Sequence, residues 1–203
     1  MLQQHEMTRS VLSIFLPSVS PEVAIKFMNK KRYGNCAVIT MHVKPYQTLP
    51  SLVNAREAAA FLVLFHRMLD SCFEECGFIR VCRFSGVFIA VTSDDADFGH
   101  NLSKLHQNTS CRRRALLCAK YVQKRLETFN RTYKVNTAVG VSIMSGAVAL
   151  GVACSLDLSL GVSGSIVTTG SMLAVREADN IVVDDSFATE ARKTVSSHIK
   201  KFS

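Results

Sequence analysis

The sequence contains no apolar run long enough to cross a membrane as a helix, for which about 18 residues are needed. Its best run, 58–65, is closed by Arg67. The first fifteen residues hold His5, Glu6 and Arg9 among apolar residues, so they lack the uninterrupted core of a secretion signal. A mitochondrial presequence stays open because the segment is amphipathic and the chain is basic, although Glu6 argues against it. We expect an intracellular protein, cytoplasmic or cytoskeletal.

The closely spaced cysteine and histidine pairs that bind structural zinc are also lacking. Cys72 and Cys76 are one helical turn apart, and Cys111 and Cys118 two turns apart, so each pair suits one face of a helix. The cysteines are odd in number and lie in apolar surroundings, which predicts buried, reduced thiols in a reducing compartment. We predict no metal and no cofactor. The seven cysteines are Cys36, Cys72, Cys76, Cys82, Cys111, Cys118 and Cys154.

Basic residues outnumber acidic ones, 24 to 16, which gives a formal net charge of +8. They cluster at 30–32, at 112–114 and near the C-terminus, in 192–193 and 200–201. Aromatic residues are not interleaved with these clusters as on a base-stacking surface. Solvated helix ends are therefore the expected role of the clusters. Contact with nucleic acid or with an acidic protein surface stays open as the alternative.

The pattern of apolar residues predicts alternating strands and helices within one domain, for which 203 residues are sufficient. This order indicates an α+β sandwich of the ferredoxin-like, split βαβ kind, in which helices cover a mostly antiparallel sheet. The polar stretches 94–107 and 155–163 are expected to connect elements. The expected elements are a strand at 36–43, a helix at 54–76 ended by Gly77, a hairpin of strands at 78–84 and 87–91, a helix capped by Thr109 or Ser110, strands at 134–142 and 147–154 around a turn at 144–146, a helix at 165–176, a strand at 180–183 and a helix at 184–199.

Five segments together resemble the catalytic domain of class III nucleotidyl cyclases, the adenylyl and guanylyl cyclases. Arg80 to Val91 (RVCRFSGVFIAV) matches the family's hairpin K-I-K-T-I-G-D-x-x-M-A-V without a gap. Gly164 to Leu173 (GSIVTTGSML) matches G-D-T-V-N-x-A-S-R-M, also without a gap. The segment 38–43 resembles the family's first strand, 139–151 resembles its strand pair beginning V-G-I-x-x-G, and 11–27 resembles its leader. Their shared order and spacing support the resemblance.

The family's chemistry depends on six side chains. Two aspartates hold two metal ions that activate the ribose 3′-hydroxyl, an asparagine orients the ribose, an arginine stabilises charge on the α-phosphate, and an aspartate and a lysine read the base. The resemblance implies that all six are replaced. The corresponding residues are His42 and Gly86 for the metal aspartates, Thr168 for the asparagine, Met172 for the arginine, Gly161 for the base-reading aspartate and Cys82, or a residue beside it, for the lysine.

Few neighbouring residues could take over the roles of the missing catalytic side chains. A single imidazole at His42 is a ligand for a transition metal but cannot replace two carboxylates for magnesium, so a structural role is expected for it. The acidic cluster at 94–97 is expected to be a solvated loop directed away from the site. Arg80 and Arg83, which flank the base-reading position, leave anion binding open.

The resemblance therefore implies a degenerate cyclase homology domain over 35–203, after a leader helix segment at 1–34. Its expected function is that of a pseudoenzyme, a dimerisation or scaffold module in an intracellular assembly or a cyclic-nucleotide signalling complex. The expected partner is another cyclase-like domain or a multi-subunit assembly, and nucleotide binding is not expected. The chain begins close to the leader, so we expect another chain to supply the signal or scaffold. Two alternatives stay open: a regulatory nucleotide-binding domain, and a divergent adenylate or guanylate cyclase that uses His42 and the acidic cluster.

Overall fold

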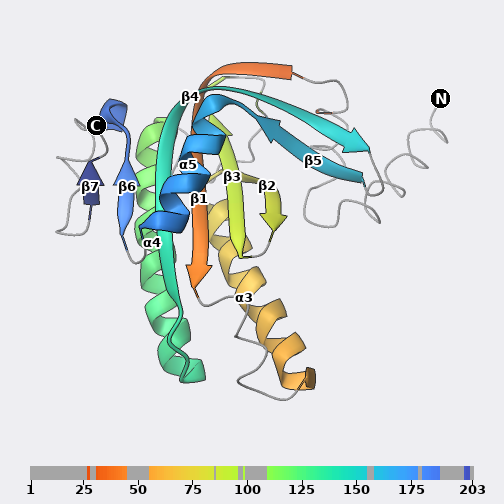
Figure 1. Cartoon of the computed structure of the whole chain (residues 1–203), viewed down its shortest axis with the longest axis vertical. Helices are drawn as coiled ribbons and strands as arrows, with labels where there is room; N and C mark the ends of the chain where they lie inside the picture. The colour runs from red at the N-terminus through yellow and green to blue at the C-terminus, as the bar shows by residue number, and fades with distance from the viewer. Residues whose placement is uncertain are drawn as a thin grey trace.

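A sheet with helices on both faces forms the body of the molecule. The computed structural model describes residues 27, 31–44, 55–84, 86–95, 98, 109–154, 158–177, 180–187 and 199–201. Figure 1 shows α5 in front of the sheet and α3 and α4 behind it. The α+β sandwich is thereby confirmed. No helix within the described residues is both long and apolar enough to cross a membrane.

Within the described residues the sheet has seven strands, in the order β2-β3-β1-β4-β6-β7, and β5 pairs with β4 outside that path. The pairs β1–β3, β1–β4, β2–β3 and β4–β5 are antiparallel, whereas β4–β6 and β6–β7 are parallel. The prediction of a mostly antiparallel sheet is confirmed. The strands are β1 (Lys31–Lys44), β2 (Ile79–Phe84), β3 (Val87–Ser93), β4 (Ala138–Cys154), β5 (Leu158–Ser163), β6 (Ile181–Val183) and β7 (Ile199–Lys201).

The two central strands are longer than the sequence predicts. β1 begins at Lys31, so it crosses the boundary expected between the leader segment and the domain; apart from these residues and Phe27, the leader lies outside the described residues. The turn predicted at 144–146 is wrong, because β4 runs on without reversing. β1 pairs with β4 on both sides of this point, Cys36 with Gly146 and Tyr33 with Val148, and the register shift between them lets the strand bend.

Near the C-terminus one prediction is wrong, and a second is wrong at both of its ends. The segment 158–163, expected to be a connection, is strand β5. The helix expected at 184–199 is replaced at its start by a 3-10 turn, η3 (Asp185–Phe187), and at its end by β7. Asp184 caps this turn, because its carboxylate accepts a hydrogen bond from the backbone N–H of Ser186 (2.9 Å), and it also accepts one from the N–H of Ser145 on β4 (2.6 Å). Residues 188–198 lie outside the described part.

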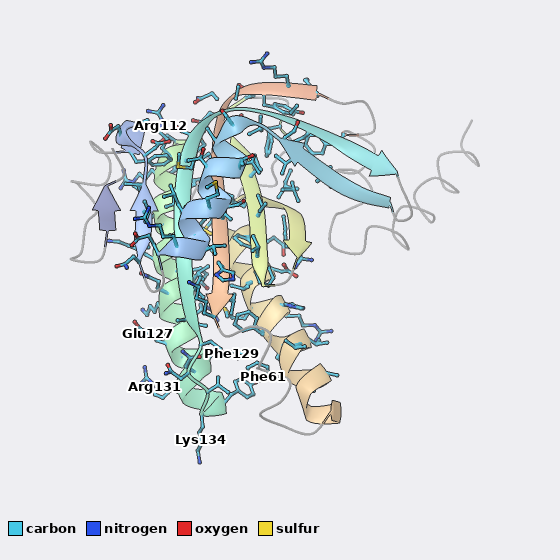
Figure 2. The ribbon with its side chains drawn as sticks, viewed as in Figure 1. Phe61, Arg112, Glu127, Phe129, Arg131 and Lys134 are labelled. Carbon is cyan, nitrogen blue, oxygen red and sulfur yellow. The ribbon has the colours of Figure 1, made fainter. Side chains whose placement is uncertain are left out.

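The rear layer consists of α3 (Ala55–Glu75) and α4 (Cys111–Tyr133), close to their predicted positions. Ser110 caps α4 by accepting a hydrogen bond from the N–H of Arg113, as predicted. Gly77, with a φ of +71°, follows the end of α3. Phe61 of α3 and Phe129 of α4 meet edge to face at 5.0 Å between the two helices (Figure 2). The ring contact joins the two helices of this layer to each other.

The front layer is α5 (Ser165–Arg176), which begins and ends where the sequence predicts. Small residues let it approach the sheet closely. The Ser142 hydroxyl of β4 donates to the carbonyl of Gly170 at 2.6 Å, and a Cβ on Gly170 would lie 3.0 Å from that hydroxyl. A Cβ on Gly140 would lie 2.2 Å from the carbonyl oxygen of Ala174. Glycine at both positions therefore sets the height of α5 above the sheet.

The thiols behave as the sequence predicts. Five cysteines are buried and free, namely Cys36, Cys72, Cys76, Cys111 and Cys118, and the side chains of the other two lie outside the described residues. Burial raises the pKa of Cys36 to about 11 and that of Cys72 and of Cys111 to about 12. A hydrogen bond with Cys118 lowers the pKa of Cys76, which is only 4% exposed.

We expect Cys36, Cys72 and Cys111 to be nearly inert in the folded protein. A pKa raised from 9.0 to about 12 lowers the reactive thiolate fraction of Cys72 about a thousandfold at neutral pH. The unfolded chain ionises these three thiols near pH 9 and the folded chain only near pH 11 to 12, so their contribution to the free energy of unfolding should fall as pH rises above 9. Labelling with a thiol reagent, with and without denaturant, measures the difference. Labelling of Cys72 at the same rate in both states would contradict the account, and Cys72→Ala identifies its signal.

Candidate functional site

The structure brings the two positions expected for metal ligands together. His42 lies near the end of β1, where it pairs with Val87 of β3 and with Gly140 of β4. Gly86 lies in the β2–β3 turn with a φ of +83°, and its carbonyl accepts a hydrogen bond from the N–H of Val43 at 2.9 Å. The positive φ explains a glycine at this turn. Neither residue of this adjacent pair carries a carboxylate.

His42 is held in an environment that keeps it neutral. Burial, with a smaller contribution from the charge of Lys44, lowers its pKa. Its Nδ1 atom is buried and has no hydrogen-bond partner among the described residues. Lys44, two residues further along β1 and therefore on the same face, donates from Nζ to the carbonyl of Val175 in α5. The ammonium group of Lys44 thus lies at the same end of β1 as His42, and its hydrogen bond joins β1 to α5.

The positions expected to carry the asparagine and the arginine lie on the exposed side of α5. Thr168 and Met172 are one turn apart, and Val175 follows on the next turn. Met172 is 70% exposed and Val175 43%, so Met172 is the most exposed large apolar side chain among the described residues. Neither Thr168 nor Met172 offers the amide or the cation that the family's chemistry needs. The three residues form an exposed stripe, which we call the α5 stripe.

The base-reading positions lie elsewhere on the sheet. Gly161 is in β5 and pairs with Gly151 of β4, whereas His42 pairs with Gly140. Eleven residues separate these two points on β4, which is roughly 37 Å of strand. Cys82 pairs with Ile89 through the backbone, and its side chain lies outside the described residues. The candidate site positions therefore fall into separate groups.

Two charged features that the sequence analysis left open have structural roles. Arg80 forms an ion pair with Asp70 of α3, so it is not a spare cation for an anion. Asp94 is not merely solvated: its Oδ1 accepts from the N–H of Cys111 at 2.7 Å and lies 3.3 Å from the guanidinium of Arg114. Arg83 has no described side chain, and Asp97 lies outside the described residues.

The arrangement offers hydrogen bonds and positive charge but few ligands for a hard cation. Within the described residues, no group of three or more His, Cys, Asp or Glu side chains is placed to hold a metal ion. The adjacency of His42 and Gly86 is what the resemblance leads us to expect. Lys44 was not found from the sequence, although its place two residues after His42 puts it on the same face of β1.

Solved cyclase domains have the same fold. The adenylyl cyclase CyaB from P. aeruginosa has a TM-score of 0.68 and 11% identity over 83% of this chain and 85% of that chain. The guanylate cyclase domain of RhGC from Catenaria anguillulae, in complex with GTP, has a TM-score of 0.64 and 19% identity over 80% of this chain and 84% of that chain. A non-canonical dimeric guanylyl cyclase domain of the RhoGC fusion protein from Blastocladiella emersonii has a TM-score of 0.63 and 18% identity over 80% of this chain and 86% of that chain. No protein-family model and no curated protein matches the sequence.

Proposed function

Because the chain has the fold of the class III adenylyl and guanylyl cyclase catalytic domains, we propose that it is a catalytically inactive domain of this fold that serves as an association module. Its partner is another cyclase-like domain or a larger assembly inside the cell. The observation that carries the proposal is the pair His42 and Gly86, which lie side by side where the resemblance places two metal-binding aspartates.

The charges around this pair support inactivity. Cyclase chemistry needs carboxylates to hold the metal ions that neutralise the triphosphate. Here the imidazole of His42 is kept neutral and Lys44 brings a positive charge, which repels a divalent cation. On α5, Thr168 and Met172 provide neither of the groups that act on the ribose and the α-phosphate. Both halves of a shared site are thus replaced, so the chain cannot supply either half to an active partner.

The α5 stripe supports association. An exposed methionine followed by an exposed valine on one helix is costly in water and is stabilised when a partner covers it. One of the solved neighbours is described as a non-canonical dimeric guanylyl cyclase domain, so pairing is compatible with this fold. The α5 stripe carries the positions of Thr168 and Met172, which in the family face a site shared between subunits. We therefore place the partner over α5.

Met172→Glu should weaken association with the native partner at least tenfold, because a charge replaces an apolar anchor, whereas Val63→Glu should change it less than twofold. Val63 is the matched control, since it is 49% exposed and lies on α3, on the opposite face of the sheet. The measurement is co-purification of the tagged chain with its partner, quantified by mass spectrometry. A photo-crosslinking residue at position 172 should capture a cyclase-like domain or a second copy. Equal co-purification of both variants, or equal crosslinking from positions 172 and 63, would contradict the placement.

A second candidate function is regulatory nucleotide binding without turnover. It is favoured by solved neighbours that hold nucleotides, one with GTP and another with ATPαS. Thermal-shift measurement decides between the two. A nucleotide at a hundred times its dissociation constant would stabilise the fold by about 2.7 kcal/mol, whereas an association module without a nucleotide site shows no shift with any nucleotide.

A further inference from the structure

The positive charge of this chain is concentrated in α4. Its 23 residues hold seven Lys and Arg and one acid, Glu127, whereas the whole chain holds 24 and 16. Most of the formal net charge of +8 therefore comes from one helix. The first turn carries Arg112 and Arg113, where the helix dipole disfavours cations. Helix stability alone therefore does not explain why so many cations are placed in α4.

Four of these cations form a straight row along one side of the helix, which we call the α4 row: Arg113, Lys120, Lys124 and Arg131. They follow one another at steps of 7, 4 and 7 residues, which return to the same side of a helix with 3.6 residues per turn. At 1.5 Å per residue the row is about 27 Å long. Lys120 is half-buried and the other three are exposed, and the buried residues of α4 lie on the opposite side.

The remaining cations in the body of α4 are used within the chain. Arg114 is buried beside Asp94, and Arg125 lies over the ring of Tyr121 and 3.8 Å from Glu75. By contrast, the three exposed members of the α4 row form no ion pair with any residue that the structure describes. Arg113, Lys124 and Arg131 thus present charge outward that no described residue pairs with.

We propose that the α4 row docks an acidic helical segment of a protein partner. Carboxylates at steps of 7, 4 and 7 on a second helix lying along α4 each face one cation of the row. Glu127 lies between Lys124 and Arg131, and Figure 2 shows Glu127 and Arg131 extending from the side of α4 away from α3. A helical protein partner can carry a lysine opposite Glu127. The phosphate backbone of a nucleic acid has no positive group to place there. The alternating charge therefore selects a protein partner.

Nucleic acid and lipid fit this surface less well. The ring of Tyr121 is covered by Arg125. Tyr133 is 41% exposed, but its ring packs on Phe129 with centroids 4.4 Å apart, and helical spacing places it on the side of α4 opposite the row. Base stacking needs rings presented to the ligand. Along the row only Leu117 is apolar, and it is half-buried, so the row has little to insert into a bilayer.

The test uses the full chain and two fluorescent, alanine-based helical peptides, with binding measured by anisotropy at low ionic strength. The row peptide carries glutamates at steps of 7, 4 and 7 and a lysine between the third and fourth. The scattered peptide has the same composition with its charges spread around the helix. We expect the row peptide to bind at least fivefold more tightly. Lys124→Glu should weaken its binding at least fivefold, and Arg67→Glu, the same charge change at an exposed position of α3, less than twofold.

Glu127→Lys gives a check of opposite sign, because it should weaken binding of the row peptide and strengthen binding of a uridine homopolymer RNA. The proposal is overturned if the row peptide does not bind, if both peptides bind equally, or if Lys124→Glu and Arg67→Glu have equal effects. Tighter binding of the RNA or of phosphatidylserine vesicles than of the row peptide also overturns it. These results do not depend on the α5 stripe, since α4 lies on the other face of the sheet.

Discussion

Gly140→Ala should destabilise the fold by about 3 kcal/mol, because the added Cβ has no space between β4 and α5. It would lie 2.2 Å from the carbonyl oxygen of Ala174 and 2.4 Å from that of Glu177. Both contacts are with backbone, so no side-chain rotation relieves them. Either α5 moves away from the sheet, which breaks the hydrogen bond from Ser142 to Gly170, or β4 shifts against β1. Denaturant unfolding followed by circular dichroism measures the loss.

Gly34→Ala is the matched control for this substitution. A Cβ at Gly34 meets no atom within 4 Å, and the residue lies in the same sheet, on β1. The free energy of unfolding should therefore change by about 0.5 kcal/mol or less. The prediction fails if both variants lose the same stability. The loss at Gly140 would then reflect the strand propensity of alanine rather than a clash with the backbone of α5. Because α5 carries the proposed interface, Gly140→Ala should also reduce association with the partner.

Arg114→Ala should destabilise the fold by about 3 to 5 kcal/mol, the loss expected when one member of a buried, hydrogen-bonded charge network is removed. Arg114 is only 2% exposed, and its guanidinium donates to the Thr92 hydroxyl and to the Ser93 carbonyl, each at 2.9 Å. It also lies 3.3 Å from Asp94. Removing the side chain leaves the Thr92 hydroxyl and the Ser93 carbonyl without this donor at the junction of β3 and α4, whereas Asp94 keeps its hydrogen bond from Cys111.

Arg113→Ala provides the comparison, because the neighbouring arginine is exposed and lies in the same turn of the helix. Its loss should change the free energy of unfolding by about 0.5 kcal/mol or less, or raise it slightly by removing a cation from the helix N-terminus. Thermal and denaturant unfolding of both variants supply the measurement. Equal stability of the two variants would mean that the Arg114 network contributes nothing beyond an exposed arginine.

Much of the fold is predictable from local signals. Gly77 and Ser110 mark helix ends correctly, and the apolar pattern of 165–176 gives the bounds of α5. β5 was missed although Leu158, Leu160 and Val162 alternate with the period of a strand. The turn predicted in β4 failed because the pairing of that strand with β1, far away in the sequence, keeps it extended through Gly146.

In the candidate site, too, some features could be predicted from the sequence and others depend on packing. The adjacency of His42 and Gly86 follows from the resemblance, because a strand and a hairpin of known register place them together. The contact of Lys44 with α5 depends on how that helix sits on the sheet, which no local pattern specifies. Helical spacing does distinguish Arg114 among three consecutive arginines, because it lies four residues before Cys118 and eight before Val122, both of which are buried. Its contact with Asp94 depends on how β3 and α4 pack together, which no local pattern specifies.

Cyclic-nucleotide formation is the most direct test of inactivity. The tagged chain is purified alone and with its native partner, then incubated with ATP or GTP and with magnesium or manganese. We expect the chain alone to form no cyclic nucleotide, and the rate of any product formed by the complex to be unchanged by His42→Ala or Thr168→Ala. Product whose rate falls at least tenfold in either variant would show that this chain supplies catalytic groups, and would contradict the account.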